Sequence, residues 1–182
     1  MLNSISSILS YFIALILLIS AVEKGKGFKK FVHKIDDYKI VNKKLSFGIA
    51  LISLLFEGYL GIKFLILNVS TIDVLLYVLM MATYTFAIAK NIYKGNVRIS
   101  CGCGGVMESS RLTNLHVYRN TFLILISIFI LKSQVNSSDF SIHLSNLMWF
   151  VSALNMILIY GVIAEFNGQI KKIKRIHEII AT

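Results

Sequence analysis

The chain of 182 residues contains no proline, only two cysteines and few charged side chains. Charged residues make up 15% of it, whereas an ordinary soluble domain carries about 25%. Two cysteines are too few for a disulfide-stapled secreted module. Hydrophobic residues reach 56% and the mean hydropathy is +0.73, which excludes intrinsic disorder. The composition indicates an integral membrane protein, short enough to be one unit.

Long uncharged runs identify the predicted membrane spans. Leu2–Val22 carries no charge, and as a helix it would be about 30 Å long, the thickness of a hydrocarbon core. It lacks a basic segment before it and a clear cleavage site after it, so we predict a retained helix and not a signal peptide. The other runs are Leu45–Leu67, Val74–Ala89, Leu115–Leu131 and Leu144–Ala164.

These runs predict an all-α integral membrane bundle with five transmembrane helices, a four-helix core plus one. The transmembrane domain is predicted to cover residues 1–164, with the Glu23–Lys44 segment as a long basic loop. In residues 165–182, isoleucines recur at helical spacing against lysines and an arginine, which is typical of an amphipathic helix on the membrane surface.

The net charge of +10 is distributed very unevenly over this topology. Of the 19 basic residues, 17 fall on one predicted side, and only Lys63 and Lys132 fall on the other. Cytoplasmic loops carry the excess of lysine and arginine, so we predict this side to be cytoplasmic and the N-terminus to be outside. The charge therefore predicts contact with anionic lipid in the bilayer and no nucleic-acid partner.

The two cysteines, Cys101 and Cys103, are separated only by Gly102. A disulfide needs Cα atoms about 4.4–6.8 Å apart, and a glycine permits the necessary bend. The small ring would be strained and easily reduced, which suits a redox pair better than a structural staple. Arg98 and Arg111, which are near in sequence, and Arg119, if the fold brings it close, would favour the reactive thiolate.

Two other interpretations of the cysteines stay open. They could be idle thiols in a loop. They could also bind Zn²⁺ or Cu⁺ together with His116 or His33, although tetrahedral zinc needs four ligands and the chain has no second cysteine pair.

Two ionisable residues interrupt the predicted spans. Glu57 lies near mid-membrane, where it either has a function or packs in its protonated form against a neighbouring helix. Arg119 precedes a charge-free stretch, Asn120–Leu131, that would be only about 18 Å long as a helix. It therefore either snorkels to the interface or points into the bundle to hold a thiolate, a quinone oxygen or Glu57. Lys63, nearer an interface, is expected to snorkel.

The segment Ser100–Asn120, S-C-G-C-G-G…R-N, resembles the MauE branch of the MauE/DoxX-like membrane proteins. That family has a C-G-C-F-G-like box followed by an Arg-Asn pair at the start of the next helix, and here Gly104 replaces the usual aromatic residue. The resemblance extends over about residues 10–130. It includes Lys24 after the first helix, Tyr38 in the following loop, and the Glu57–Gly61 stretch, E-G-Y-L-G.

The resemblance implies a redox-associated bundle that supports maturation of exported, disulfide-containing proteins, as in methylamine dehydrogenase assembly. It implies a thioredoxin-like protein, or an exported cysteine-containing protein or peptide, as the partner. Carried over, Cys101 and Cys103 are the catalytic thiol–disulfide pair, and the supporting positions are Arg119, Asn120, Glu57, Lys24 and Gly102. The bundle is also similar to quinone-linked disulfide-generating enzymes, so a quinone is a candidate cofactor, without a readable motif.

The predicted topology and the implied role disagree about the side of the membrane. Charge places the cysteine loop at the cytoplasmic face, where thiols stay reduced. Either the pair relays reductant outward from a cytoplasmic donor, or the loop enters the bundle, or the charge rule misleads for this chain. The alternative function is a non-enzymatic accessory or immunity-type membrane protein of a peptide-export system, in which serine would replace either cysteine without loss.

Overall fold

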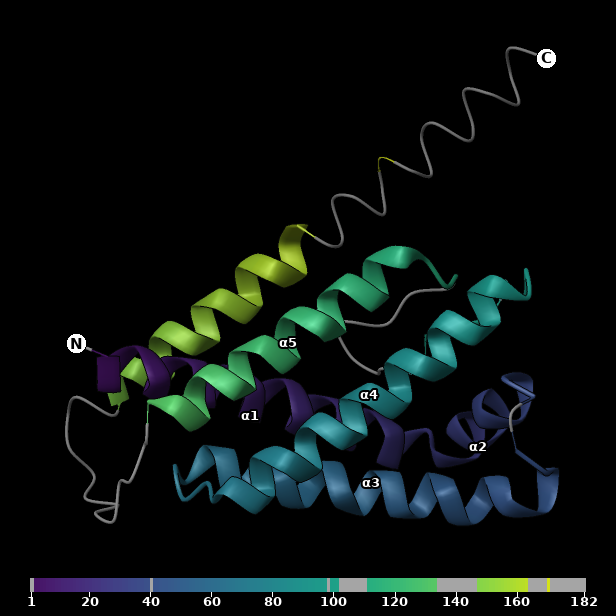
Figure 1. Ribbon diagram of the computed structural model, residues 1–182, viewed down its shortest axis with the longest axis horizontal. Coiled ribbons are helices and arrows are strands. Elements are labelled where there is room, and N and C mark those ends of the chain that lie inside the picture. Colours follow the sequence, from purple (N-terminus) through teal and green to yellow (C-terminus); the bar gives the residue numbers. More distant parts are fainter. Residues whose placement is uncertain are drawn as a thin grey trace.

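The computed structural model describes residues 2–39, 41–97, 99–101, 111–133, 147–163 and 170. Its labelled helices are α1 (Leu2–Lys26), α2 (Phe28–Asp37), α3 (Lys43–Leu65), α4 (Thr71–Tyr93) and α5 (Asn114–Lys132). A further helix covers Leu147–Ile163 (Figure 1). The described residues form no strand, and the all-α prediction is confirmed.

Four helices, α1, α3, α4 and α5, are long and apolar enough to cross a membrane. They confirm the predicted helical membrane bundle. The helix Leu147–Ile163 is shorter, about 25 Å, so a fifth crossing stays a prediction. The predicted surface helix at residues 165–182 lies outside the described residues apart from Ile170.

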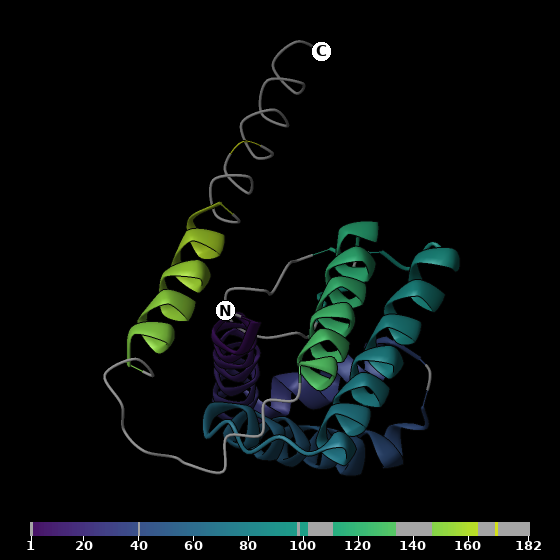
Figure 2. The same cartoon turned by 60° about the vertical axis from the view of Figure 1, so that its left-hand side comes forward.

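The membrane helices pack as two pairs, α1 with α3 and α4 with α5, and α1 also contacts α5. The helix Leu147–Ile163 lies beside the first half of α1, where Phe150 meets Tyr11 edge to face at 5.7 Å (Figure 2). A Cβ added to Gly61 of α3 would lie 2.9 Å from the Leu18 side chain of α1. A small residue at this position therefore lets α1 and α3 approach closely, as is common in membrane bundles.

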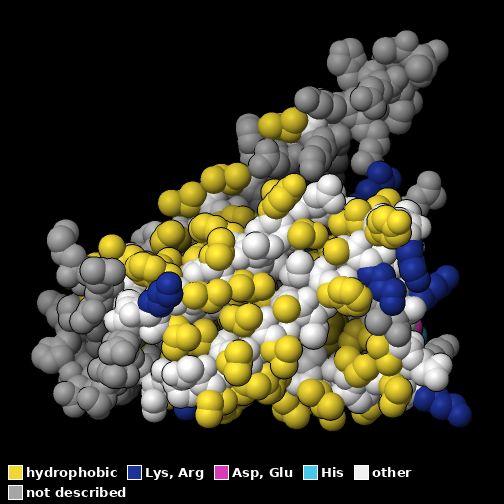
Figure 3. All heavy atoms as spheres, in the orientation of Figure 1, with side chains coloured by type: hydrophobic (Ala, Val, Ile, Leu, Met, Phe, Trp, Pro, Cys, Tyr) yellow, Lys and Arg dark blue, Asp and Glu magenta, His cyan; other side chains and the backbone are white. Residues whose placement is uncertain are grey.

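The bundle is apolar both inside and outside. Its interior buries residues from all four spans, among them Ile13, Leu60, Tyr77 and Ile126. Large apolar side chains also cover the outer faces of the same helices (Figure 3). Such a surface suits lipid as the surrounding solvent.

The prediction of a long loop over Glu23–Lys44 is wrong. Helix α1 continues to Lys26, and the ten-residue helix α2 follows almost at once. The apolar side of α2 includes Phe28, which packs edge to face on Phe47 of α3 at 5.4 Å, and the buried Phe31. The physical reason is that apolar residues recur at helical spacing among the lysines of this segment. A short amphipathic helix can therefore cover the end of the bundle.

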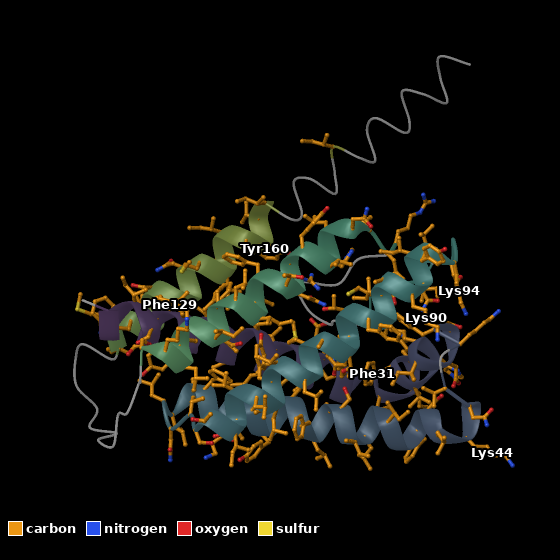
Figure 4. All side chains as sticks on the ribbon, in the orientation of Figure 1. Phe31, Lys44, Lys90, Lys94, Phe129 and Tyr160 are labelled. Carbon is orange, nitrogen blue, oxygen red and sulfur yellow. The ribbon has the colours of Figure 1, made fainter. Side chains whose placement is uncertain are left out.

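The two ends of the bundle differ in charge. The basic end is formed by α2, the ends of α1 and α4 and the starts of α3 and α5, and it carries Lys44, Lys90 and Lys94 (Figures 3 and 4). The far end contains the turn between α3 and α4 with Lys63, and the end of α5 with Lys132. The helices thus bring basic residues that are distant in sequence to one end, and the side of the membrane that this end faces stays a prediction.

Candidate functional site

A buried ion pair ties three membrane helices together. Glu57 of α3 is 1% exposed, and its Oε1 pairs with Nζ of Lys24 from α1. The same oxygen accepts a hydrogen bond of 2.6 Å from the hydroxyl of Tyr84 in α4. Its other oxygen, Oε2, accepts one of 3.0 Å from Ser20 Oγ. Glu57 is therefore joined to α1 and α4.

Lys24 is a residue of the bundle interior and not of a loop. Its side chain is only 3% exposed, and Nζ lies 4.8 Å from the ring centroid of Phe31 and 5.1 Å from that of Tyr84. Two buried charges are tolerated only when they are paired and further hydrogen-bonded. The carboxyl of Glu57 therefore faces a lysine and two hydroxyl groups, and its function stays a prediction.

Cys101 lies at the basic end, inside the fold. It is disulfide-bonded and 6% exposed, and it packs with Ile88, Ile99 and Leu112. Cys103, the other cysteine of the chain, lies with Gly102 outside the described residues. Cys101 itself is therefore buried within the fold, and the side from which the pair is reached stays a prediction.

Arg119, at the start of α5, lies next to this sulfur. Its Nη2 is 3.7 Å from Cys101 Sγ and also donates to Asn120 Oδ1 at 3.5 Å. Asn120 is 2% exposed, and its Nδ2 has no hydrogen-bond partner within the described part of the chain. The guanidinium therefore lies beside the disulfide-bonded sulfur, and its role in holding a thiolate stays a prediction.

Tyr38 fixes the backbone of the cysteine segment to α2. Its hydroxyl donates to the carbonyl oxygen of Cys101 at 2.9 Å. Burial raises the pKa of Tyr38 to about 12, so the hydroxyl remains a donor at neutral pH. Asn91 of α4, itself buried, donates in turn to the Tyr38 carbonyl at 3.2 Å. Beyond the family's loop tyrosine, no signal in the sequence indicates this contact.

A cavity of about 230 Å³ connects the ion pair to the sulfur site. It lies among α1, α2, α3 and α4, and both Lys24 and Cys101 line it. Phe31 of α2, labelled in Figure 4, and Tyr84 of α4 form part of its wall. The sequence does not predict this cavity.

The histidines proposed as metal ligands occupy other positions. His116 is buried, and its Nδ1 lies 3.1 Å from the backbone nitrogen and 3.0 Å from Oγ1 of Thr113, within the cap of α5. His33 is exposed on α2. Within the described ranges, no three histidine, cysteine or acidic side chains form a group that could hold a metal ion.

Fold and site together define a multi-pass helical membrane protein with a buried Lys–Glu pair beside a disulfide-bonded cysteine. The chain belongs to the MauE family, "Methylamine utilisation protein MauE", whose model matches residues 2–133. It is 28% identical over 152 residues to the methylamine utilization protein MauE of Methylophilus methylotrophus, covering 83% of this chain and 80% of that protein. No solved structure matches the chain. The resemblance seen in the sequence is confirmed, and the matched range contains α1 to α5.

Proposed function

We propose that the chain is a membrane thiol–disulfide redox protein that uses Cys101 and Cys103. It would support disulfide formation or maturation of an exported protein or peptide, together with a thioredoxin-like partner. The observation that carries this proposal is the Arg119 guanidinium 3.7 Å from the buried, disulfide-bonded Cys101. The Methylophilus methylotrophus relative is named for methylamine utilisation, and we propose the same broad setting for this chain.

The burial of Cys101 suggests an order of events. A partner thiolate attacks Cys103, the bond between the two protein sulfurs breaks, and Cys101 leaves as a thiolate beside Arg119. A second partner thiolate then displaces Cys103, so that the partner gains a disulfide and loses two electrons and two protons. A stabilised thiolate is the better leaving group. The reverse sequence reduces a partner disulfide through the same mixed disulfide.

The remaining predicted residues act in this proposal as positioning residues. Glu57 and Lys24 hold α1, α3 and α4 around the cavity that Cys101 lines. Asn120 accepts a hydrogen bond from Arg119 and so restrains the guanidinium. Gly102 would supply the bend between the two cysteines.

The proposal includes an orientation. We propose that the basic end faces the cytoplasm, because 17 of 19 basic residues belong to that side of the topology. The buried position of Cys101 within this end supports access to the sulfur through the bundle and not only from the aqueous cytoplasm.

The test is thiol alkylation with mass-shift detection in intact cells. A membrane-impermeant and a permeant reagent are compared, each with and without prior reduction. We expect the pair to shift only after reduction, and C101S to accumulate a mixed disulfide through Cys103 while C103S does not. The reagent that reaches the thiols reports their side. Thiols that are always free, form no mixed disulfide and tolerate serine would instead support the accessory or immunity-type function.

A further inference from the structure

The cavity beside Cys101 has a sulfur on one side and a buried cation on another. We propose that it binds the ring of an isoprenoid quinone, and that this quinone re-oxidises the Cys101–Cys103 dithiol. The inference rests on the proposed redox function and names its electron acceptor.

The size and wall of the cavity favour a single flat ring. Sites for drug-sized ligands measure roughly 300–1,000 Å³, and this cavity measures about 230 Å³. This volume matches one substituted ring and is smaller than the sites that hold drug-sized ligands. Phe31, Ala87 and Ile88 give it an aromatic and aliphatic wall, which suits a ring that partitions into lipid.

The position of the cavity suggests that its ligand arrives from the bilayer. Helices α3 and α4 diverge toward the basic end (Figures 1 and 2), and the cavity lies in this fork. Ile49 of α3, 39% exposed, and the exposed Thr83 of α4 both line it. Both side chains belong to candidate membrane spans. An isoprenoid tail could therefore leave between α3 and α4 into the lipid, while the ring stays beside Cys101.

The polar groups of the wall are suited to carbonyl oxygens. Lys24 and Tyr84 line the cavity, and their ammonium and hydroxyl groups already meet at Glu57 Oε1. Ser53 also lines it, with its Oγ 2.5 Å from the Tyr84 hydroxyl. A few such groups in an otherwise apolar site orient a ligand. The Tyr84 hydroxyl donates its single proton to Glu57, but the Lys24 ammonium has three N–H groups. Lys24 can therefore pair with Glu57 and also donate to a quinone carbonyl and to the oxyanion that develops from it.

The redox step balances between the dithiol and the ring. The S–H bonds of Cys101 and Cys103 break and the S–S bond forms, which releases two electrons and two protons. These convert the two carbonyl groups of the quinone into the two hydroxyl groups of the quinol. The two cysteines have different roles in this proposal. Cys101 lines the cavity that holds the quinone ring, and the partner exchanges at Cys103.

The experiment uses the full chain in phosphatidylcholine nanodiscs, reduced and then freed of reductant. Decylubiquinone is added without oxygen, quinol formation is followed by absorbance, and thiols are counted by alkylation. We expect one quinol for each disulfide formed. A87F fills the cavity and should slow this reaction at least about tenfold. A82F places the same ring on an exposed alanine of α4 that does not line the cavity, and should leave the rate unchanged.

Two further measurements separate this inference from the proposed function. Exchange with a dithiol peptide is measured without quinone. If exchange proceeds but decylubiquinone oxidises no thiol, or oxidises A87F as fast as wild type, the quinone site is wrong and the redox function stands. If no exchange occurs, the redox function fails.

Binding is then tested alone with an azidoquinone photolabel on C101S. Labelling at Phe31 or Tyr84 that A87F abolishes supports the site, and labelling that A87F leaves unchanged overturns it.

Discussion

Glu57 and Asp73 are both buried carboxylates on membrane helices, and each combines a lysine with a tyrosine hydroxyl. At the far end, Asp73 Oδ1 accepts from Tyr59 at 3.1 Å, and Oδ2 lies 3.6 Å from Lys63 Nζ. The backbone nitrogen and Oγ of Ser70 also donate to Oδ2, at 2.9 Å and 2.8 Å. A lysine, a tyrosine and a serine side chain thus surround each of the two carboxylates. Glu57 is 1% exposed and Asp73 is 2% exposed.

The difference lies in where the partners come from. The partners of Asp73 are within 14 residues of it in sequence, and its lysine side chain is 27% exposed. The partners of Glu57 are 27 to 37 residues away on two other helices, and its lysine is 3% exposed and lines a cavity. Asp73 completes the capping box of α4, so its role is local. Glu57 depends on partners from two other helices, and in the proposed function it acts as a positioning residue.

The largest expected effect is on stability at the basic end. K24M leaves a buried carboxylate without its cation, which costs about 3–5 kcal/mol. K63M removes a partly exposed cation and should cost no more than about 1 kcal/mol. Both are measured as free energies of unfolding in detergent.

The double variant K24M/E57Q provides the control for that comparison. Removing both charges leaves no uncompensated ion, and the glutamine amide that E57Q introduces can still accept a hydrogen bond from Tyr84. The double variant should therefore lose less than K24M alone. Equal losses for K24M and K63M would show that the two carboxylates are energetically alike.

An intermediate effect is expected on thiol reactivity. In reduced C103S, only Cys101 can react, and Arg119 should favour its thiolate. R119Q should slow alkylation of Cys101 by iodoacetamide at pH 7 about tenfold, the factor that corresponds to about 1.4 kcal/mol. R119K keeps the charge and should retain most of the rate. K63M is the far-end control and should leave the rate unchanged, whereas equal rates in all variants would remove Arg119 from the sulfur chemistry.

Sequence reasoning identifies the membrane helices because hydropathy is a local property. It also places Arg119 near Cys101, since both flank the start of one helix. It misses α2, because a high density of lysine is typical of a loop, although apolar residues recur there at helical spacing. Ending the first span at Val22 also leaves Lys24 outside the bundle, so its pairing with Glu57 is not predictable.

The cavity and the hydrogen bond from Tyr38 to Cys101 cannot be predicted from the sequence, because they depend on the three-dimensional arrangement of several helices. Both depend on how α2, α3 and α4 lie around the cavity, and no spacing within one segment specifies that arrangement. Asp73 shows the opposite case. A serine three residues before an acid is a recognisable capping signal, which can be read without knowledge of the bundle.

The smallest expected effect lies at the far end, and it tests whether the two ends are independent. S70A removes the side chain that caps α4 and should cost about 1 kcal/mol. Asp73 keeps the Ser70 backbone N–H, Tyr59 and Lys63, so the loss should stay local. Cys101 alkylation and quinol formation should match wild type.

S53A is the matched variant at the basic end. Ser53 lines the cavity beside Tyr84, so S53A should slow quinol formation. If S70A slows it as much as S53A, the two ends are coupled through the bundle, and the local role assigned to Asp73 is wrong.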